Sequence, residues 1–443
     1  MSKDEKRAAI LKRVKKEGVK FIAMQFTDIL GKQKVCEIPI TKLEDALNSG
    51  LWFDGSSIEG FVRIHESDMF LMPDPDTYAI VPMTDNKVAR IICDVYVDEK
   101  TPFEGDPRGC LKRTLAKAKE MGYEYFVGPE LEFFFFKNGE ASCQTTHDTA
   151  GYFDLAPLDL ASDIKREVVP YLGMMGIDVE MAHHEVAPGQ HEIDFRYGDA
   201  LKVADSVITY KNVVKRTAQK YGLFASFMPK PVYGINGSGM HTHQSLWKNG
   251  ENAFYSSKDE YGLSDVAKSF IAGQLHHARA ICGVVAPTVN SYKRLVPGYE
   301  APVYICWSQI NRSALIRVPR HIEGKKSATR LELRCPDPSC NPYLAFSVML
   351  AAGLDGVKKG MKPPEPVEED VYDFDDEKLK KFYIKTLPGS LGEALEEMGK
   401  SELVKQTLGK HIYEKLTAAQ REHWDEYRIR VTPWEIETYF PIL

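Results

Sequence analysis

The chain has 443 residues, of which 43% are apolar, 27% charged and 11% aromatic, a composition ordinary for a globular protein of two or three domains. A formal net charge of −6 argues against a general binder of nucleic acids or membrane surfaces, and no uncharged apolar run is long enough to span a bilayer. The eight cysteines are dispersed without a CxxC pair, which predicts reduced thiols in a cytoplasmic protein.

The first hundred residues are predicted to form a small β-rich unit. Residues 1–17 mix Lys and Glu with spaced apolar side chains, the pattern of an amphipathic surface helix. Segments with strand composition follow at 19–26, 34–40, 78–81 and 89–97. Between them, residues 52–57 (WFDGSS) are expected to form a polar loop. Two prolines and a glycine in 101–108 indicate a domain boundary.

The rest of the chain carries most of the predicted helices. Apolar side chains recur with helical spacing over 110–121, 163–175, 200–221, 263–280, 341–357, 391–398 and 402–424. Residues 287–302 hold three prolines and one glycine among charged side chains. This composition is typical of a long loop that serves as a lid or substrate flap.

Carboxylates within apolar strands point to a bound cation. Residues 128–136 (GPELEFFFF) place Glu130 and Glu132 on one face of a strand that is otherwise apolar. Burying carboxylates there is costly unless they are paired or bind a cation. Glu185 and Glu192 flank a Pro-Gly turn, and a hairpin would bring both to the same place.

Residues 236–245 (NGSGMHTHQS) combine a glycine-containing turn with an alternating strand. Residues two apart in a strand share a face, so His241, His243 and Ser245 would point into one space beside the turn. A polar strand end with satisfied histidines explains this stretch about equally well when it is taken alone.

Together these segments form an oxygen-rich set, completed by Glu332 in an alternating strand, that suits Mg²⁺ or Mn²⁺ better than zinc. A zinc hydrolase built on the histidine pairs is the competing interpretation, although the HExxH spacing is absent. Guanidinium groups are natural partners of carboxylates and phosphates, and the same half of the chain offers Arg294, Arg312, Arg317, Arg330 and Arg334. Metal ligands, arginines and a glycine-rich turn favour phosphoryl transfer from a nucleotide. The sequence has no Walker motif, which argues against a P-loop enzyme.

Seven stretches occur in the order found in one enzyme family. FDGSS followed by ESD (53–68), GPELEF, HHEVAPGQHE, KPVYGINGSGMHTHQS, NSYKRLVPGYEAP, NRSALIRVP and RLELRCPDP resemble the motifs of type I glutamine synthetases, essentially end to end. The resemblance implies an α+β fold. A small N-terminal β-grasp-like domain (1–103) would precede a larger C-terminal α/β catalytic domain (104–443), whose mainly antiparallel curved sheet is flanked by helices.

The resemblance also implies an activity in nitrogen assimilation. ATP, as co-substrate, would drive ligation of glutamate and ammonium to glutamine through a γ-glutamyl phosphate, with two or more Mg²⁺ or Mn²⁺ ions per site. One metal would be held by Glu132, Glu185 and Glu192. The other, which would hold the ATP phosphates, would be bound by Glu130, His241 and Glu332.

Further roles follow by matched motif. The residues on the nucleotide side would be Glu180, His243, Ser245, Arg317 and Arg330. Glutamate or the transferred phosphate would be held by Asn236, Gly237, Arg294, Arg312 and Arg334, of which Arg312 is also counted as catalytic. Asp54 would take the proton from ammonium, and Glu300 would close the site against water.

Assembly and regulation are implied as well. Asp54 would come from the neighbouring subunit of a homo-dodecamer of two hexameric rings, with regulatory proteins as further partners. Arg63 matches an arginine tied to glutamine feedback inhibition, and Lys385 stands where a related subgroup carries an adenylylated tyrosine. Both features indicate the shorter, non-adenylylated subgroup. The alternatives are a ligase of the same fold that joins glutamate to another amine, and a catalytically silent homologue.

Overall fold

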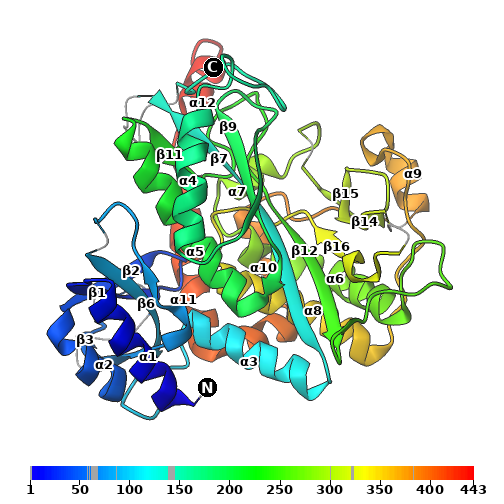
Figure 1. Cartoon of the computed structure of the whole chain (residues 1–443). Helices are drawn as coiled ribbons and strands as arrows, with labels where there is room; N and C mark the ends of the chain where they lie inside the picture. Colours follow the sequence, from blue (N-terminus) through cyan, green and yellow to red (C-terminus); the bar gives the residue numbers. More distant parts are fainter. Residues whose placement is uncertain are drawn as a thin grey trace.

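The chain folds around two β-sheets, each with its own hydrophobic core (Figure 1). The computed structural model describes residues 2–56, 58, 60, 68–85, 87–137, 145–299, 301–320, 324–382 and 384–443. Within these ranges, no helix combines the length and apolarity that crossing a membrane requires. The α+β class predicted from the sequence is confirmed.

The N-terminal sheet has the strand order β2-β1-β6-β4-β3, and β5 also pairs with β6. Its parallel pair is β1 with β6, and the other pairs are antiparallel. The strands are β1 (Phe21–Thr27), β2 (Gln33–Pro39), β3 (Leu51–Asp54), β4 (Asp68–Pro73), β5 (Ala79–Ile80) and β6 (Val88–Tyr96). Helices α1 (Lys3–Lys16) and α2 (Leu43–Ser49) belong to the same part of the chain.

The expectation of a polar loop over 52–57 is only partly met, because Trp52, Phe53 and Asp54 end strand β3. This strand is four residues long, and it exists through antiparallel pairing with β4, in which Asp54 stands opposite Asp68. A strand so short gives no periodic signal in the sequence, so only the pairing reveals it.

The second sheet has the order β14-β15-β16-β12-β7-β9-β8, with β10 and β11 paired to β7 and β13 to β12. It is mainly antiparallel; β14 and β15 run parallel. The strands are β7 (Glu124–Phe136), β8 (Val179–His184), β9 (Gln190–Phe195), β10 (Gly198–Asp199), β11 (Phe224–Ser226), β12 (Met240–Lys248), β13 (Glu251–Asn252), β14 (Tyr304–Ser308), β15 (Ala314–Arg317) and β16 (Leu331–Leu333).

Strand β7 is anchored within this sheet by an aromatic run that is buried on both faces. Phe133 and Phe135 pack into the main core, whereas Phe134 and Phe136 pack into a smaller cluster on the other face. Burial on both sides anchors the strand firmly and therefore fixes the positions of the two glutamates that precede the run.

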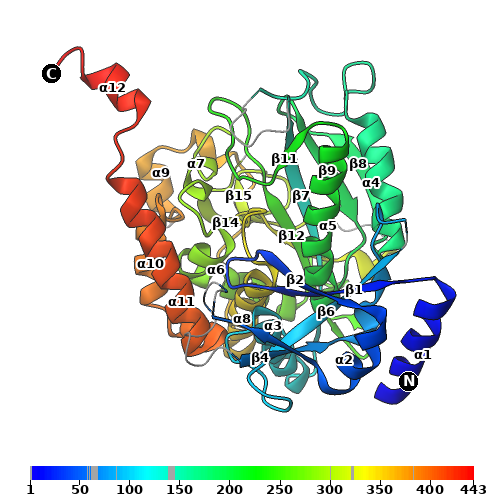
Figure 2. The ribbon, with the colours of Figure 1, turned by 90° about the vertical axis from the view of Figure 1, so that its left-hand side faces the viewer.

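Most of the remaining helices pack around the larger sheet. The predicted helices are confirmed within a few residues at their ends, except that the helix predicted over 263–280 runs on to Val285. The remaining helices are α3 (Pro107–Glu120), α4 (Ser162–Met174), α5 (Ala200–Lys220), α6 (Asp265–Val285), α7 (Ser291–Arg294), α8 (Pro342–Lys359), α9 (Asp376–Lys381), α10 (Leu391–Gly399), α11 (Glu402–Arg428) and α12 (Pro433–Tyr439). Figure 2 shows α12 projecting away from the body of the molecule. Trp434 in this helix and Phe440 directly after it are exposed apolar side chains.

A buried arginine joins the two sheets. Arg108, in the first turn of α3, contacts Asp94 at 2.7 Å and Asp74 at 2.8 Å in the N-terminal part of the chain. It also donates to both carboxylate oxygens of Asp205 in α5, at 3.0 and 2.9 Å. Burial would raise the pKa of Asp74, but the guanidinium outweighs it and lowers that pKa. The cluster therefore links the N-terminal sheet to the helices of the larger unit by paired charge.

Arg108→Ala is expected to lower the free energy of unfolding by about 3–5 kcal/mol, because it leaves buried carboxylates without a partner. Thermal and denaturant unfolding would measure this loss. Arg166→Ala serves as the control, since Arg166 pairs with Asp163 where both side chains are largely exposed. Equal, small effects of the two substitutions would contradict the structural role of the cluster.

Candidate active site

The register of four neighbouring strands collects the predicted metal ligands. In the pairing of β12 with β7, His241 stands opposite Glu130, and in the pairing of β7 with β9, Glu132 stands opposite Glu192. On its other side β12 pairs with β16, which carries Glu332. The predicted hairpin is confirmed as β8 and β9.

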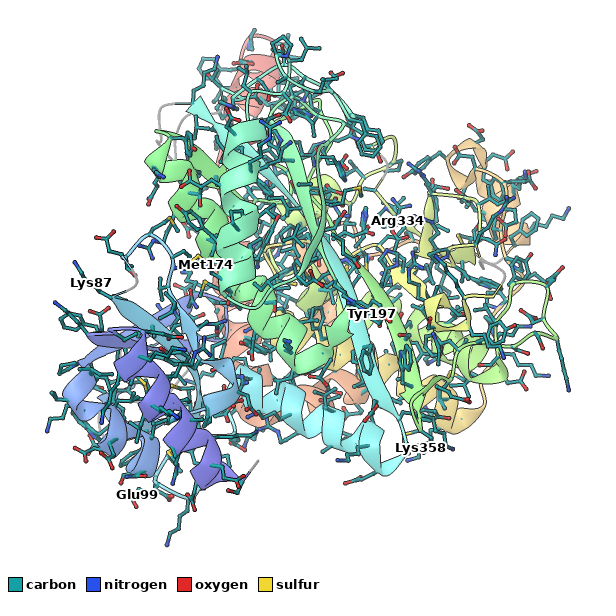
Figure 3. All side chains as sticks on the ribbon, viewed as in Figure 1. Lys87, Glu99, Met174, Tyr197, Arg334 and Lys358 are labelled. Carbon is teal, nitrogen blue, oxygen red and sulfur yellow. The ribbon has the colours of Figure 1, made fainter. Side chains whose placement is uncertain are left out.

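A cavity of about 370 Å³ opens where these strands meet, and Figure 3 labels one of its lining residues, Arg334. The predicted residues that line it are Glu130, Glu132, Glu185, Glu192, Asn236, Gly237, His241, Arg294, Arg312, Arg317, Glu332 and Arg334. A larger cavity, of about 650 Å³, lies elsewhere and is lined by no carboxylate of the described residues. The chemistry of its walls, and not its size, therefore identifies the first cavity as the site.

Glu130, His241 and Glu332 form the first ligand group. Each offers one ligand atom, and these atoms lie within 4.8 Å of one another. Burial, together with nearby Arg334 and Arg294, holds the pKa of His241 well below its usual range, so the imidazole is neutral. A neutral imidazole with two carboxylates is a donor set that fits Mg²⁺ or Mn²⁺.

Glu185 and Glu192 form the second group together with His183, again with ligand atoms within 4.8 Å. Glu132 lies beside them, opposite Glu192 in the pairing of β7 with β9. Burial, and then the charge of Glu185, raises the pKa of Glu132 to about 8. Burial and nearby Asp194 also raise the pKa of Glu192 well above its ordinary value. Carboxylates that resist ionisation because they are buried together fit a site that a cation would complete.

The glycine turn before β12 lies against an immobilised arginine. A Cβ on Gly237 would come within 2.3 Å of the Pro229 carbonyl oxygen, and one on Gly239 within 2.5 Å of Arg294 Nη2. Arg294 is 4% exposed and donates to the carbonyl of Cys335 at 3.0 Å. The turn therefore depends on glycine for close approach, and its backbone lies directly beside the guanidinium.

Arginines form another wall of the first cavity. Arg317 Nη1 lies 2.9 Å from Glu332 Oε2, and Arg334 Nε lies 3.6 Å from Glu332 Oε1. Arg312 is exposed in the described chain while its neighbours Asn311 and Ser313 are buried. Cationic side chains therefore line the cavity beside Glu332, where they offer guanidinium groups to an anionic substrate.

A second cavity, of about 410 Å³, shares Glu130 with the first. His243 Nε2 contacts Glu130 Oε1 at 2.7 Å, and Arg330 Nε donates to His243 Nδ1 at 3.2 Å. Arg330 thereby fixes the tautomer, with the proton on Nε2 toward the carboxylate. Four of the residues predicted for the nucleotide side line this cavity: Glu180, His243, Ser245 and Arg330. Arg317, the fifth, lines the first cavity instead.

One predicted residue of the described chain, Asp54, is not brought to either cavity. Asp54 is exposed at the end of β3, and its Oδ1 accepts a hydrogen bond from the Ser56 N–H at 2.8 Å, which lowers the pKa of the carboxyl. It lines neither cavity of its own chain. Arg63 and Glu300 lie outside the described residues.

The cavity also contains residues that sequence reasoning did not select. Tyr152 and Tyr299 line it from loops, and Asp194 lines it from β9. Gln190 lines it from the first position of β9, inside the GQHE motif. The alternation of β9 was a usable signal for Asp194, which shares a face with Glu192, whereas no periodic pattern marks the loop tyrosines.

A third cluster, Asp148, His184 and His191, has the spacing of a metal site but different chemistry. His184 Nε2 contacts Asp148 at 3.0 Å, and its Nδ1 contacts the Glu185 carbonyl at 2.6 Å. Both ring nitrogens therefore donate, which leaves no lone pair for a metal. The Lys165 ammonium lies 3.3 Å from His191 Nδ1 and would repel a cation. These contacts argue against the zinc interpretation of the histidine pairs.

Comparison with known proteins assigns nearly the whole chain to one family. The model of "Glutamine synthetase, catalytic domain" matches residues 104–439, and that of "Glutamine synthetase, beta-Grasp domain" matches residues 18–98. The chain belongs to the glutamine synthetase family. The glutamine synthetase of Thermus thermophilus is 52% identical over 441 residues, 98% of each chain. That of Methanocaldococcus jannaschii is 53% identical over 439 residues, 96% of each chain.

A solved structure described as "GmaS/ADP complex-Conformation 1" is similar with a TM-score of 0.89 at 32% identity, covering 97% of this chain and 99% of that one. The family predicted from the motifs is therefore confirmed, as is an N-terminal β-grasp part followed by a larger catalytic part. Sequence identity of about 50% to glutamine synthetases over nearly the whole length shows the activity, which is the ATP-dependent ligation of glutamate and ammonium to glutamine. The family uses ATP and a divalent metal, and nothing in these comparisons favours another amine.

Cation binding at the second ligand group is expected to release protons near neutral pH. The ordinary pKa of a glutamate is near 4.5, whereas that of Glu132 is raised to about 8. The folded, metal-free protein therefore keeps this proton over a pH range in which the unfolded chain has lost it. The stability that this group contributes is full below about pH 4 and is lost as the pH rises through about 8.

A bound Mg²⁺ requires the ionised carboxylate, so its apparent affinity should rise between about pH 6 and pH 8. Calorimetric titration at pH 7 in two buffers of different ionisation enthalpy would count the released protons. Glu132→Gln should release fewer protons than the unmodified protein, because its amide has no proton to lose in this range, whereas Glu192, whose pKa is also raised, can still lose one. Metal binding without proton release in the unmodified protein would rule out the raised pKa.

Proposed function

We propose that the first cavity holds glutamate and two divalent cations, and that the second holds the nucleotide. The observation that carries this assignment is the strand register, which places two carboxylate groups side by side between a glycine turn and an arginine wall. Glu130 lines both cavities, so the two would meet at the ligands of the first group. The ADP named for the structural relative supports a nucleotide in this fold.

The proposed residue roles follow from charge and position. Cations at the two groups would neutralise the phosphates as the γ-carboxylate of glutamate attacks the terminal phosphorus of ATP. Arg294, Arg312 and Arg334 would hold the carboxylates of glutamate and the transferred phosphoryl group. Attack forms the acyl phosphate and releases ADP; ammonia then attacks the acyl carbon and phosphate departs.

Ammonium becomes a nucleophile only after it loses a proton. We infer that Asp54 of a neighbouring subunit accepts it, because Asp54 is exposed and ionised and lines neither cavity of its own chain. This role requires an oligomer in which the N-terminal part of one chain adjoins the cavity of the next, and we propose the dodecamer of two hexameric rings. The exposed apolar side chains of α12 support a contact between copies.

The remaining assignments belong to the same proposal. Residues 1–103 and 104–443 would be the two domains, which the separate hydrophobic cores support. Glu300 would close the site, and Arg63 would mediate glutamine feedback. The cysteines of the described residues are free thiols, which supports a cytoplasmic location.

Ammonium-dependent phosphate release from ATP, glutamate and Mg²⁺ is expected, and Asp54→Ala should reduce it by about 10²-fold or more. Glu300→Ala should lower glutamine formed per phosphate released, because the intermediate would meet water. The matched control for Asp54→Ala is Asp98→Ala, since Asp98, like Asp54, is exposed and accepts backbone hydrogen bonds at 2.8 Å in a turn. Release that ignores ammonium but follows a larger amine would overturn the choice of ammonium.

Shared active sites make a separate prediction. Asp54→Ala and Glu332→Ala should each inactivate the enzyme, but co-expressed chains should regain about a quarter of the activity, because a quarter of random neighbour pairs supply both intact residues to one site. The activity of co-purified mixed oligomers would measure this. If Asp54 served its own chain, every site would carry one lesion and no activity would return.

A further inference from the structure

Gln190 lies between Glu132, a predicted metal ligand, and the predicted glutamate-binding turn of residues 236–239. It begins β9, directly after the hairpin turn, and its side chain is 1% exposed. Its Nε2 lies 2.9 Å from Glu132 Oε2 and 3.0 Å from the Gly237 carbonyl oxygen. Its Oε1 accepts from the Ala187 N–H at 3.3 Å. One amide group therefore contacts a candidate metal ligand, the turn proposed to bind glutamate, and the hairpin between β8 and β9.

These contacts fix the orientation of the amide. A primary amide has two N–H donors and one carbonyl acceptor. The Gly237 carbonyl can only accept and the Ala187 N–H can only donate, so the nitrogen must face Gly237 and Glu132 and the oxygen must face Ala187. A flipped amide would set oxygen against oxygen at Gly237 in a buried place, which costs far more than the present arrangement.

Both partners of Gln190 are held rigidly by other contacts. Glu132 Oε2 also accepts from the Gly239 N–H at 2.9 Å, and the Glu132 N–H donates to the Gly239 carbonyl at 3.2 Å. The turn is confined at Gly237, where a Cβ would come within 2.3 Å of a carbonyl oxygen. A shift of the Glu132 carboxylate toward a cation would therefore move the turn through short hydrogen bonds and not through soft packing.

We propose that Gln190 is a positioning residue that couples cation binding at Glu132 to glutamate binding at the turn of residues 236–239. The proposal rests on the proposed roles of Glu132 and Gly237, and it adds a thermodynamic link between them. By linkage, a cation that tightens glutamate binding is itself bound more tightly by the same factor when glutamate is present. Coupling between two binding sites is typically worth about 5- to 150-fold in affinity.

The test compares glutamate affinity with and without metal in three proteins. Calorimetric titration of glutamate, without ATP, is performed in excess Mn²⁺ and in EDTA. The unmodified enzyme should bind glutamate at least about fivefold more tightly with Mn²⁺. Gln190→Met keeps the length of the side chain and removes every hydrogen bond of the amide, including a long one of 3.5 Å to Ser238 Oγ. It should reduce the effect of Mn²⁺ to less than about twofold.

The chain offers a closely matched control in Gln274 of α6, whose side chain is 0% exposed. Its Nε2 also donates twice, to Gln244 Oε1 at 2.7 Å and to the Met349 carbonyl at 3.0 Å. Its Oε1 also accepts once, from Gln244 Nε2 at 3.2 Å. Gln274→Met should lower the melting temperature to a similar extent while the fivefold or greater effect of Mn²⁺ persists.

Each result decides the question. Retained coupling in Gln190→Met, or equal loss of coupling in both variants, overturns the proposal. If Gln190→Met does not fold, Gln190→Glu takes its place, because a carboxyl group fills the same space but cannot donate to both Glu132 and the Gly237 carbonyl, and it should also lose the coupling. Absence of glutamate binding in the unmodified enzyme at any Mn²⁺ concentration would instead contradict the proposed glutamate site, whereas binding without coupling contradicts only the role of Gln190.

Discussion

Burial of several carboxyl groups close together between neighbouring strands is the constraint on which this site depends. Glu132 and Glu192 stand opposite each other across β7 and β9, and Glu185 lies near them at the hairpin. Burial, and then the charge of Glu185, raises the pKa of Glu132 to about 8, and burial with nearby Asp194 raises the pKa of Glu192 well above its ordinary value. Carboxyl groups buried in this way keep their protons until positive charge arrives, which fits a cavity that combines arginines with cation ligands.

The surrounding fold holds these carboxyl groups in fixed positions. The Phe133–Phe136 run anchors β7 in apolar cores on both faces, and the ladder with β12 extends over most of that strand. Arg294 is tied to backbone carbonyls and not to the glutamates, so its charge stays directed at the cavity. Rigid strands and backbone-anchored cations are the arrangement that electrostatic preorganisation requires.

Local sequence patterns predicted the elements of the site well, but not all of its residues. The period-2 alternation around His241 and the Pro-Gly turn before Glu192 correctly indicated a strand and a hairpin. The four-residue strand that ends at Asp54 was missed because it owes its existence to pairing with β4. Gln190 gave no signal of its own, since a buried amide is recognised only by the partners that satisfy it.

The sequence by itself determined the chemical inventory: carboxylates in apolar strands, histidines beside a glycine turn, arginines downstream, and seven motifs in a family's order. Only the tertiary structure decided which of them meet. Alternation states which face of a strand a side chain occupies, but the register between β7, β12 and β16 depends on contacts between segments far apart in the chain. For that reason Glu180 and Arg330 joined the second cavity, whereas Arg317 joined the first.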